Sequence, residues 1–376
     1  MDEIDLCIVG PAGRDTGGVA RYIAEQQQAL PDRVASRVYD VTTPPDAGLA
    51  ASMLFALAAV VRFPFRDRPD VVHVHTSHYR SFYLSAAYVF LAATLWRRPV
   101  VTHVHGSSFD EFVATDSPVL AGLQAAVFEA SDRVVVLSEY WADALAHRVD
   151  EHKLLVLPNA IDPDGYAPQF DVDPPHLAFV SNHIERKGIR ELATAVDVLL
   201  DDGPEFEVTI AGSGPLSWLA EDLAAAHEQV TYAGYVSEET KRDLLSRASI
   251  YALPTYAEGL PIALLEGMAG GNAVVSTRAG SIPDVIGTEN GELVTAGDVD
   301  ELRGALKRLI TDPDRTEAVG RRNRRLVEEH YSWDRAAERL TALYDVLCDD
   351  STDGSSGGDN RPTCRIATDP ADSTAD

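Results

Sequence analysis

Residues 251–286 read YALPTYAEGLPIALLEGMAGGNAVVSTRAGSIPDVI, and the rest of the chain is arranged around this stretch. Two short apolar runs typical of buried strands flank a segment typical of a helix: residues 251–254 and 273–277 on either side of 262–268. Pro261 suits the first turn of that helix, and Gly270 and Gly271 end it. The stretch therefore predicts a strand, a loop, a helix and a second strand, which is a unit of an α/β fold.

This unit carries two carboxylates, Glu258 on the loop and Glu266 in the helix. The helix N-terminus offers unpaired N–H groups and a positive dipole end, so we expect an anion there. With a diphosphate at that point, Glu266 could accept hydrogen bonds from ribose hydroxyls, and Glu258 could reach a sugar beyond the phosphates. The alternative is an acid at a helix start and a solvated helical acid, which is common. The flanking apolar strands weigh against it, because a carboxylate in a packed unit needs a partner.

The run E-G-L-P-(x)4-E-G-M-A-x-G, from Glu258 to Gly271, resembles the E-x7-E signature of the retaining GT-B glycosyltransferases of family 4. The resemblance covers about residues 4–348. It implies two Rossmann-like domains facing a cleft, with a final helix that returns to the first domain. It also implies transfer of a sugar from a nucleotide-diphosphate sugar, which is a substrate, with no cofactor and no metal.

The order of apolar runs along the chain agrees with this architecture. Strand-like and helix-like segments alternate on both sides of a Pro- and Asp-rich stretch, Ile161–Pro175, which we interpret as a linker. Such alternation predicts two doubly wound parallel sheets. We expect an acceptor-side domain, a nucleotide-sugar-binding domain, a helix packed back on the first domain and a disordered acidic tail: residues 1–165, 166–330, 331–348 and 349–376.

Composition restricts the class of protein. The 376 residues carry a net charge of −27, which argues against binding to nucleic acid or to an acidic membrane by bulk electrostatics. Arginine supplies nearly all the positive charge, since there are only four lysines. A salt-rich cytoplasm would favour such a chain, although a high-GC genome favouring arginine codons is an alternative. Three scattered cysteines fit a reducing compartment, and an acidic start does not fit a signal peptide, so we expect a cytoplasmic protein.

Four histidines end two successive strands of the first half as His73-Val74-His75 and His103-Val104-His105. Four histidines so placed could bind zinc, but no carboxylate or cysteine joins them, and we favour polar anchors at strand ends. Gly106 opens a loop after His105. The segment is similar to the H-G segment of family 4, which implies that His105 contacts the donor sugar. A core histidine satisfied by the backbone is the alternative.

Lys187 lies in a loop between a strand and a helix of the second half. A lysine in so arginine-rich a chain suggests a compact ammonium aimed at phosphate, and a solvated loop charge is the alternative. The segment resembles the family loop that grips the donor diphosphate with an arginine and a lysine. Here Asn182 stands in place of that arginine. Either Arg186 substitutes for it, or Lys187 and the amides of Gly259 and Leu260 hold the phosphates alone.

Three glycines complete the expected donor site. Gly17 and Gly18 open a helix and would let backbone N–H groups approach an anion or a sugar, unless they serve only a tight turn. Their spacing does not fit G-x-G-x-x-G, so a dinucleotide site is not indicated. Gly212 belongs to a G-x-G-P turn that resembles the one lining the nucleotide pocket of the family.

The hypothesis that follows is a retaining, metal-independent glycosyltransferase with Glu258, His105 and Lys187 as its catalytic residues. Lys187 would stabilise the departing diphosphate, while Glu258 and His105 would orient the donor sugar. Two alternatives remain. One is a non-hydrolysing nucleotide-sugar epimerase on the same fold, and the other is a catalytically silent GT-B partner subunit.

The acceptor is suggested by residues 48–66. An apolar segment there ends in Arg62-Phe63-Pro64-Phe65-Arg66, and a second apolar segment, 82–95, ends in Trp96-Arg97-Arg98. Both are too short to span a bilayer, but arginine and aromatic residues suit a membrane interface. For 82–95 we favour a buried crossover helix. For 48–66 a peripheral contact with the inner face of the cell membrane stays open, which would make the acceptor a lipid-linked glycan for the cell surface.

Overall fold

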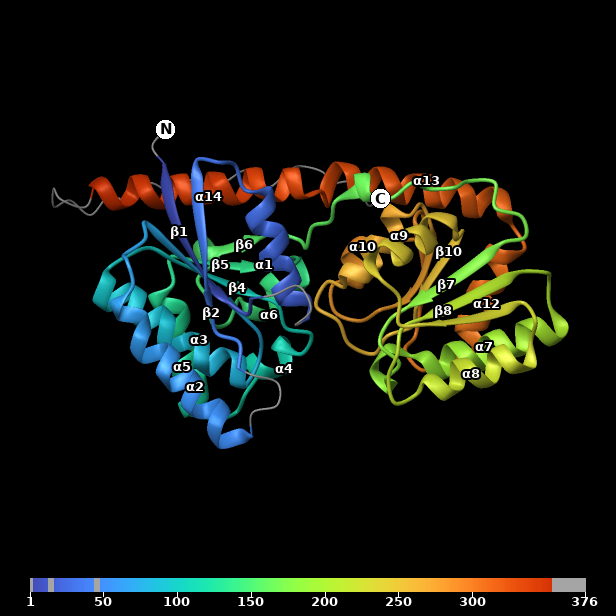
Figure 1. Ribbon diagram of the computed structural model, residues 1–376, viewed down its shortest axis with the longest axis horizontal. Coiled ribbons are helices and arrows are strands. Elements are labelled where there is room, and N and C mark those ends of the chain that lie inside the picture. Colours follow the sequence, from blue (N-terminus) through green and yellow to red (C-terminus); the bar gives the residue numbers. More distant parts are fainter. Residues whose placement is uncertain (1–2, 13–16, 44–47, 354–376) are drawn as a thin grey trace.

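The computed structural model describes residues 3–12, 17–43 and 48–353. Figure 1 shows two halves, each built on a six-stranded sheet with helices on both faces. Every pairing within the sheets is parallel. A hydrophobic core lies on each face of each sheet, which is why the strands appear in the sequence as continuous apolar runs. The predicted fold class of two Rossmann-like halves is confirmed.

The first sheet has the order β2-β1-β3-β4-β5-β6. Its strands are β1 (Ile4–Gly10), β2 (Val34–Asp40), β3 (Val71–Thr76), β4 (Val100–Val104), β5 (Arg133–Val136) and β6 (Leu154–Val156). The helices of this half are α1 (Gly18–Ala29), α2 (Leu49–Arg62), η2 (Phe63–Phe65), α3 (Arg80–Phe90), η3 (Leu91–Trp96), α4 (Phe109–Val113), α5 (Pro118–Ala130), α6 (Glu139–Leu145) and η4 (Glu151–Lys153).

The second sheet has the order β12-β11-β10-β7-β8-β9. Its strands are β7 (His176–Val180), β8 (Glu207–Ala211), β9 (Val230–Gly234), β10 (Ile250–Leu253), β11 (Ala273–Thr277) and β12 (Gly291–Val294). The helices are η5 (Pro163–Gly165), η6 (Glu185–Lys187), α7 (Ile189–Asp202), α8 (Ser217–Ala226), α9 (Glu238–Arg247), α10 (Ile262–Ala269), α11 (Ile282–Val285), α12 (Val299–Ile310) and α13 (Pro313–His330).

Each sheet has a point at which the strand order reverses. In the first sheet β1 lies between β2 and β3, and in the second β7 lies between β10 and β8. Crossovers leave the two sides of such a point in opposite directions, so the loops at the carboxyl ends of these strands leave room for a ligand. The predicted site residues lie in or next to these loops.

The last helix, α14 (Trp333–Asp353), returns to the first half as predicted. Trp333, Leu340 and Tyr344 are buried against that half, and the Trp333 indole N–H donates to Glu25 on α1 at 3.0 Å. In Figure 1, α13 and α14 follow one edge of the molecule past both halves. The helix continues to Asp353, beyond the expected boundary at 348, and the rest of the predicted disordered tail lies outside the described residues.

The two apolar segments of the first half differ in their surroundings. The segment expected as a helix over 82–95 is α3 followed by a π-helical turn, η3, which together connect the adjacent strands β3 and β4 with most of their apolar side chains buried or partly buried. The predicted buried crossover is therefore confirmed there. The other segment, α2 with η2, has a different pattern of exposure, described below. Within the described part of the chain, no helix combines the length and apolar character needed to cross a bilayer.

Candidate active site

Glu258 lies on the loop between β10 and α10, and its carboxylate is buried, with 7% of the residue exposed. The Lys187 ammonium donates a short hydrogen bond to its Oε1 atom. Thr255 Oγ1 lies 3.1 Å from the same oxygen, and Arg186 Nη1 lies 3.6 Å away. Two residues from η6 and one from the β10 loop thus surround one carboxylate. The structure brings together Glu258 and Lys187, which the sequence predicted as catalytic.

A glycine makes this pairing possible. Gly188 follows η6 with a φ of 71°, and a Cβ at this position would lie 1.9 Å from the carbonyl oxygen of Pro254. Only glycine therefore allows η6 to approach the end of β10 so closely. The approach is reinforced by Arg186, whose Nη1 donates to the Ala257 carbonyl at 2.6 Å. Asn182 is exposed, so Arg186, and not Asn182, is the residue that contacts the Glu258 loop.

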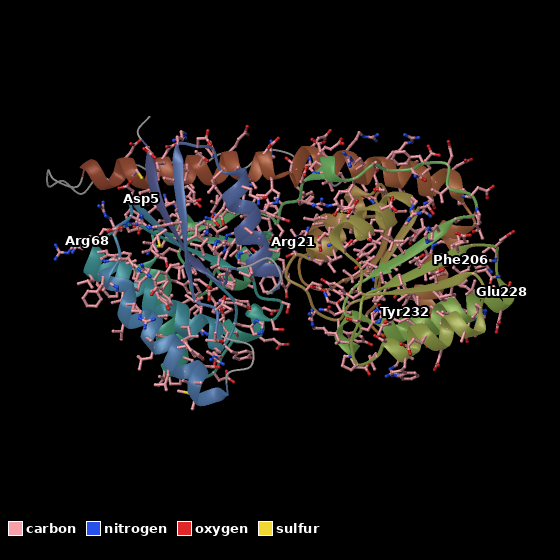
Figure 2. All side chains as sticks on the ribbon, viewed as in Figure 1. Asp5, Arg21, Arg68, Phe206, Glu228 and Tyr232 are labelled. Carbon is pink, nitrogen blue, oxygen red and sulfur yellow. The ribbon has the colours of Figure 1, made fainter. Side chains whose placement is uncertain are left out.

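Glu266 lies on α10 and is also buried, with 3% of the residue exposed. It accepts a hydrogen bond from Arg21 Nη1 of α1 at 2.8 Å and pairs with Lys241 Nζ of α9 at 2.7 Å. Figure 2 shows Arg21 at the boundary between the two halves. Burial alone would lower the pKa of the Arg21 guanidinium, but the carboxylates of Glu266 and Glu25 raise it above its ordinary value. Arg21 of the first half and Lys241 of the second half therefore neutralise Glu266, the residue predicted to bind the ribose.

Arg21 and Lys241 were not predicted as site residues from the sequence. Lys241 is one of the four lysines, and the argument from lysine scarcity that selected Lys187 could have selected it as well. Arg21 had no such signal, because its partner lies 245 residues away in the chain. Arg21 and Glu266 come together only because the second half packs against α1.

The four histidines form a stacked group under α1 and α14. His75 Nδ1 lies 2.8 Å from His105 Nε2, and His73 Nε2 lies 3.2 Å from His103 Nδ1. The Tyr344 hydroxyl of α14 lies 2.6 Å from His73 Nδ1. Burial lowers the pKa of His73 and His105 to about 3 and that of His75 and His103 well below the ordinary value. All four imidazoles are therefore neutral at neutral pH.

Three of these side chains, His73, His75 and His103, place ring nitrogens within 4.8 Å of one another, which is a spacing that could hold a metal ion. Against this stands the pairing of ring nitrogens within the group. His73 already shares one nitrogen with His103 and the other with Tyr344, and stacked rings do not direct their lone pairs at one point. The arrangement fits hydrogen-bonded polar anchors, and the expectation of a metal-independent enzyme stays a prediction.

His105 is half-buried at the carboxyl end of β4 and begins the loop that faces Glu258. A Cβ on Gly259 would lie 3.4 Å from the Gly106 carbonyl oxygen, so the loop after His105 and the loop after Glu258 are in contact. The first half holds the second loop in place. The Trp141 indole N–H donates to the Gly259 carbonyl at 3.3 Å, and Asn159 Nδ2 donates to the Leu260 carbonyl at 2.6 Å. The halves thus meet at the loop that carries the predicted chemistry.

The other predicted donor residues lie in three places. Gly17 precedes α1 with a φ of 116°, and a Cβ on Gly17 or Gly18 would meet no atom of the described residues within 4 Å, so the described part of the chain leaves their backbone open to a ligand. The carbonyls of Gly259 and Leu260 accept hydrogen bonds from the first half, and no side chain of the described residues caps the N-terminus of α10. Gly212 has a structural reason to be glycine, since a Cβ there would lie 1.9 Å from the Ser181 carbonyl oxygen.

Two Rossmann-like halves with charged strand-end loops meeting at their boundary define the GT-B class of nucleotide-sugar enzymes. Solved structures share this fold. Sucrose-phosphate synthase from Thermosynechococcus elongatus superposes with a TM-score of 0.74 at 18% identity, covering 92% of this chain and all of the other. Such low identity supports the fold alone.

Family models match both halves. Residues 16–164 match "Glycosyltransferase Family 4", and residues 174–312 match "Glycosyl transferases group 1". The chain belongs to the family-4 glycosyltransferases of GT-B fold.

Characterised relatives cover parts of the chain. An MMP alpha-(1->4)-mannosyltransferase of Mycolicibacterium hassiacum is 30% identical over 303 residues, which are 78% of this chain and 66% of the relative. A GDP-mannose-dependent monoacylated alpha-(1-6)-phosphatidylinositol monomannoside mannosyltransferase of Corynebacterium glutamicum is 32% identical over 180 residues, 45% of this chain and 46% of the relative. The chain thus spans two thirds or less of the length of these two relatives.

Proposed function

We propose that the chain transfers a hexosyl group, with retention of configuration, from a nucleotide-diphosphate sugar to a hydroxyl acceptor. The observation that carries the proposal is the cluster of the buried Glu258 with Lys187 and the half-buried Arg186 beside the N-terminus of α10, with Glu266 about one turn into that helix. Cations and helix N–H groups are what a departing diphosphate requires, because negative charge develops there in the transition state.

The donor would replace contacts that the protein makes with itself. Lys187 and Arg186 would turn from Glu258 to the diphosphate, which frees the carboxylate for the sugar. Ribose hydroxyls would bind Glu266, whose present partners are Arg21 and Lys241. Each charged group of the donor site is therefore already neutralised, so it is not left as an unpaired buried charge before the donor arrives.

The reaction is proposed as direct transfer. The acceptor oxygen attacks the anomeric carbon, the bond from that carbon to the diphosphate oxygen breaks, and the acceptor proton passes to the leaving phosphate. Glu258 and His105 orient the sugar, and the low pKa of His105 keeps it a neutral hydrogen-bonding group at neutral pH. A glycosyl adduct trapped on Glu258 and found by mass spectrometry would replace this scheme with a covalent one.

The substrates are suggested by the relatives. A relative named as GDP-mannose-dependent and as acting on a phosphatidylinositol mannoside makes GDP-mannose the first donor to test and a lipid-linked glycan the first acceptor class. The product would be a cell-surface glycan, made by a protein that works in the cytoplasm at the inner face of the membrane.

A donor panel tests the proposal and separates it from its alternatives. The protein is incubated with GDP-mannose, UDP-glucose or UDP-N-acetylglucosamine, with and without acceptor lipid, and the anomeric configuration of the product is read by NMR. Acceptor-dependent transfer with retention supports the proposal. Conversion of the donor alone indicates the epimerase, and nucleotide binding without turnover across donors and acceptors indicates the silent partner subunit.

A further inference from the structure

Helix α2 has its large apolar side chains on the outside. Met53, Leu54, Leu57 and Val61 are each more than half exposed, whereas Ser52 is 6% exposed. Positions 53, 54, 57 and 61 follow the spacing of a single helix face. The side of α2 that packs on the protein is lined mainly by Ser52 and alanines, with Val60 as its one large apolar contact to the core among the described residues. This arrangement is the reverse of an ordinary surface helix, so the exposed stripe is not explained by the core of this chain.

The exposed apolar side chains of the protein are also concentrated in this segment. Fifteen large apolar side chains are exposed among the described residues, and six of them lie between Met53 and Phe65. Phe65 of η2, at 85%, is the most exposed of all fifteen. Single exposed apolar residues need no explanation, but a contiguous patch of them marks a surface that binds something. In Figure 1, α2 lies along the outer edge of the first half, on the opposite side from α14.

Arginines stand at one end of the stripe. Arg62, Arg66 and Arg68 are exposed, with Asp67 as the one acid among residues 62–68. Figure 2 shows Arg68 at the outer edge of the first half. In a chain of net charge −27, a local excess of positive charge beside an apolar stripe needs a reason.

The neighbouring turn η3 extends the patch. The Trp96 ring packs on the buried Phe63 ring with centroids 4.3 Å apart, and its indole N–H donates to the Pro64 carbonyl at 3.4 Å. This contact fixes the end of η3 beside η2. Exposed Leu95 and Arg97 therefore join the apolar and basic parts of the same surface. From the sequence, Phe63 and Phe65 were both expected at a membrane interface. In the structure Phe63 is a core residue that holds the surface in shape.

We propose that the outer face of α2 and η2 docks in the headgroup region of a bilayer rich in anionic lipids. Arginines beside a stripe of leucine, methionine and phenylalanine match such an interface in both charge and polarity. A second copy of this chain fits less well, because it would bring the exposed arginines of one copy against those of the other, whereas the lipid headgroups carry the opposite charge to this face. Helix α2 has 14 residues and is too short to cross the bilayer, so it would lie in the interface plane.

This inference goes beyond the proposed reaction, because a docking face can exist whichever sugar the site transfers. Where the acceptor is lipid-linked, docking would bring the acceptor-side half to the surface that holds it. Failure of docking and failure of sugar transfer are separately measurable, since vesicle binding requires no donor.

Vesicle flotation of the full chain tests the proposal, with phosphatidylglycerol vesicles compared with phosphatidylcholine vesicles. The apolar variant and its matched control, made at exposed apolar positions elsewhere, are L54Q/L57Q/F65Q and V119Q/W218Q/Y235Q. The basic variant and its matched control, made at exposed arginines of the second half, are R62Q/R66Q/R68Q and R247Q/R322Q/R325Q. Unchanged thermal shift with GDP and UDP confirms that each variant is folded.

We expect wild type and both controls to float with the anionic vesicles. The apolar variant should lose at least about tenfold in its partition coefficient, because it removes the side chains that insert. The basic variant should lose the preference for anionic over zwitterionic vesicles. The proposal is overturned if wild type floats with neither vesicle or if the apolar variant floats as well as its control. It is also overturned if sedimentation without lipid shows a wild-type dimer that the apolar variant abolishes.

Discussion

At the scale of single residues, Glu258 and Glu266 should fail in different ways when replaced. Glu258→Gln should lower turnover with little effect on nucleotide affinity, because its predicted contact is the sugar. Glu266→Gln should weaken nucleotide binding, because its predicted contact is the ribose. Glutamine is the better replacement than alanine, since it keeps a hydrogen-bonding group against the buried Arg21 and Lys241. Calorimetric titration with the nucleotide diphosphate and donor kinetics measure the two effects, and normal values for both variants would contradict the site.

Lys187 tests whether a point charge is needed. Lys187→Ala should raise the donor KM and lower kcat, because the ammonium that now contacts Glu258 is expected to bind the diphosphate. Lys187→Arg should restore only part of the loss, since a planar fork does not replace a compact ammonium beside the buried Glu258 carboxylate. Steady-state kinetics with the donor varied give the answer, and full recovery with arginine would remove the argument from lysine scarcity.

At the scale of elements, the sequence predicted those parts whose cause is local. The strand, loop, helix and strand of residues 251–277 appear as β10, α10 and β11 within a residue or two of their expected bounds, because apolar runs, Pro261 and the Gly270-Gly271 pair determine them. The contact between Glu258 and Lys187 was not itself predicted, although both were expected at the donor site, and it arises because their loops follow the neighbouring strands β10 and β7. The ion pair between Glu266 and Arg21 could not be predicted, because it depends on how the two halves meet. The exposure of α2 could not be predicted either, because an apolar helix can have the same sequence in a core or at a membrane.

The histidine group of β3 and β4 predicts how stability depends on pH. Burial lowers the pKa of His73 and His105 to about 3, whereas the same side chains in the unfolded chain titrate near 6.5. Between these pKa values the unfolded state binds more protons than the native state. The histidines therefore make their full contribution to the free energy of unfolding above pH 6.5, and this contribution falls as the pH is lowered. Each histidine contributes a slope of about 1.4 kcal/mol per pH unit.

Denaturant unfolding at pH 7.5, 6.5 and 5.5 measures this slope above the range in which carboxylates titrate. His103→Gln removes one of the four buried imidazoles, whose pKa also lies well below the ordinary value, and should make the slope shallower. Replacing the exposed His152 should leave it unchanged. A stability that is flat over this range would mean that the group is hydrated or protonated in the native state.

Whether the four histidines bind a metal ion can also be tested. Because the ring nitrogens of His73 are shared with His103 and Tyr344, we expect dialysis against a strong chelator to change neither the melting temperature nor the activity. Elemental analysis of the purified protein provides the control. A bound transition metal, with loss of stability on its removal, would turn the polar anchor into a structural metal site and contradict the metal-independent prediction.

At the scale of the whole molecule, charge sets the conditions for folding. The chain has 59 acidic residues and 32 lysines and arginines, so at least 27 carboxylates have no cationic partner even if every cation pairs with one acid. Their mutual repulsion opposes the compact state, and salt shortens its range from about 10 Å at 0.1 M to about 3 Å at 1 M. The buried pairs at Glu258 and Glu266 are shielded from salt by the protein and should be little affected. We therefore propose that the chain is adapted to a salt-rich cytoplasm and that its melting temperature rises steadily from low to molar potassium chloride. Sucrose at matched osmolality should give a smaller rise, because an uncharged solute does not screen. Neutralising the adjacent exposed acids of α8, Glu221→Gln with Asp222→Asn, should raise the melting temperature at low salt and reduce the increment gained from salt. A melting temperature independent of salt would show that the surface carboxylates lie too far apart to repel one another, and the adaptation would then be a matter of codon usage.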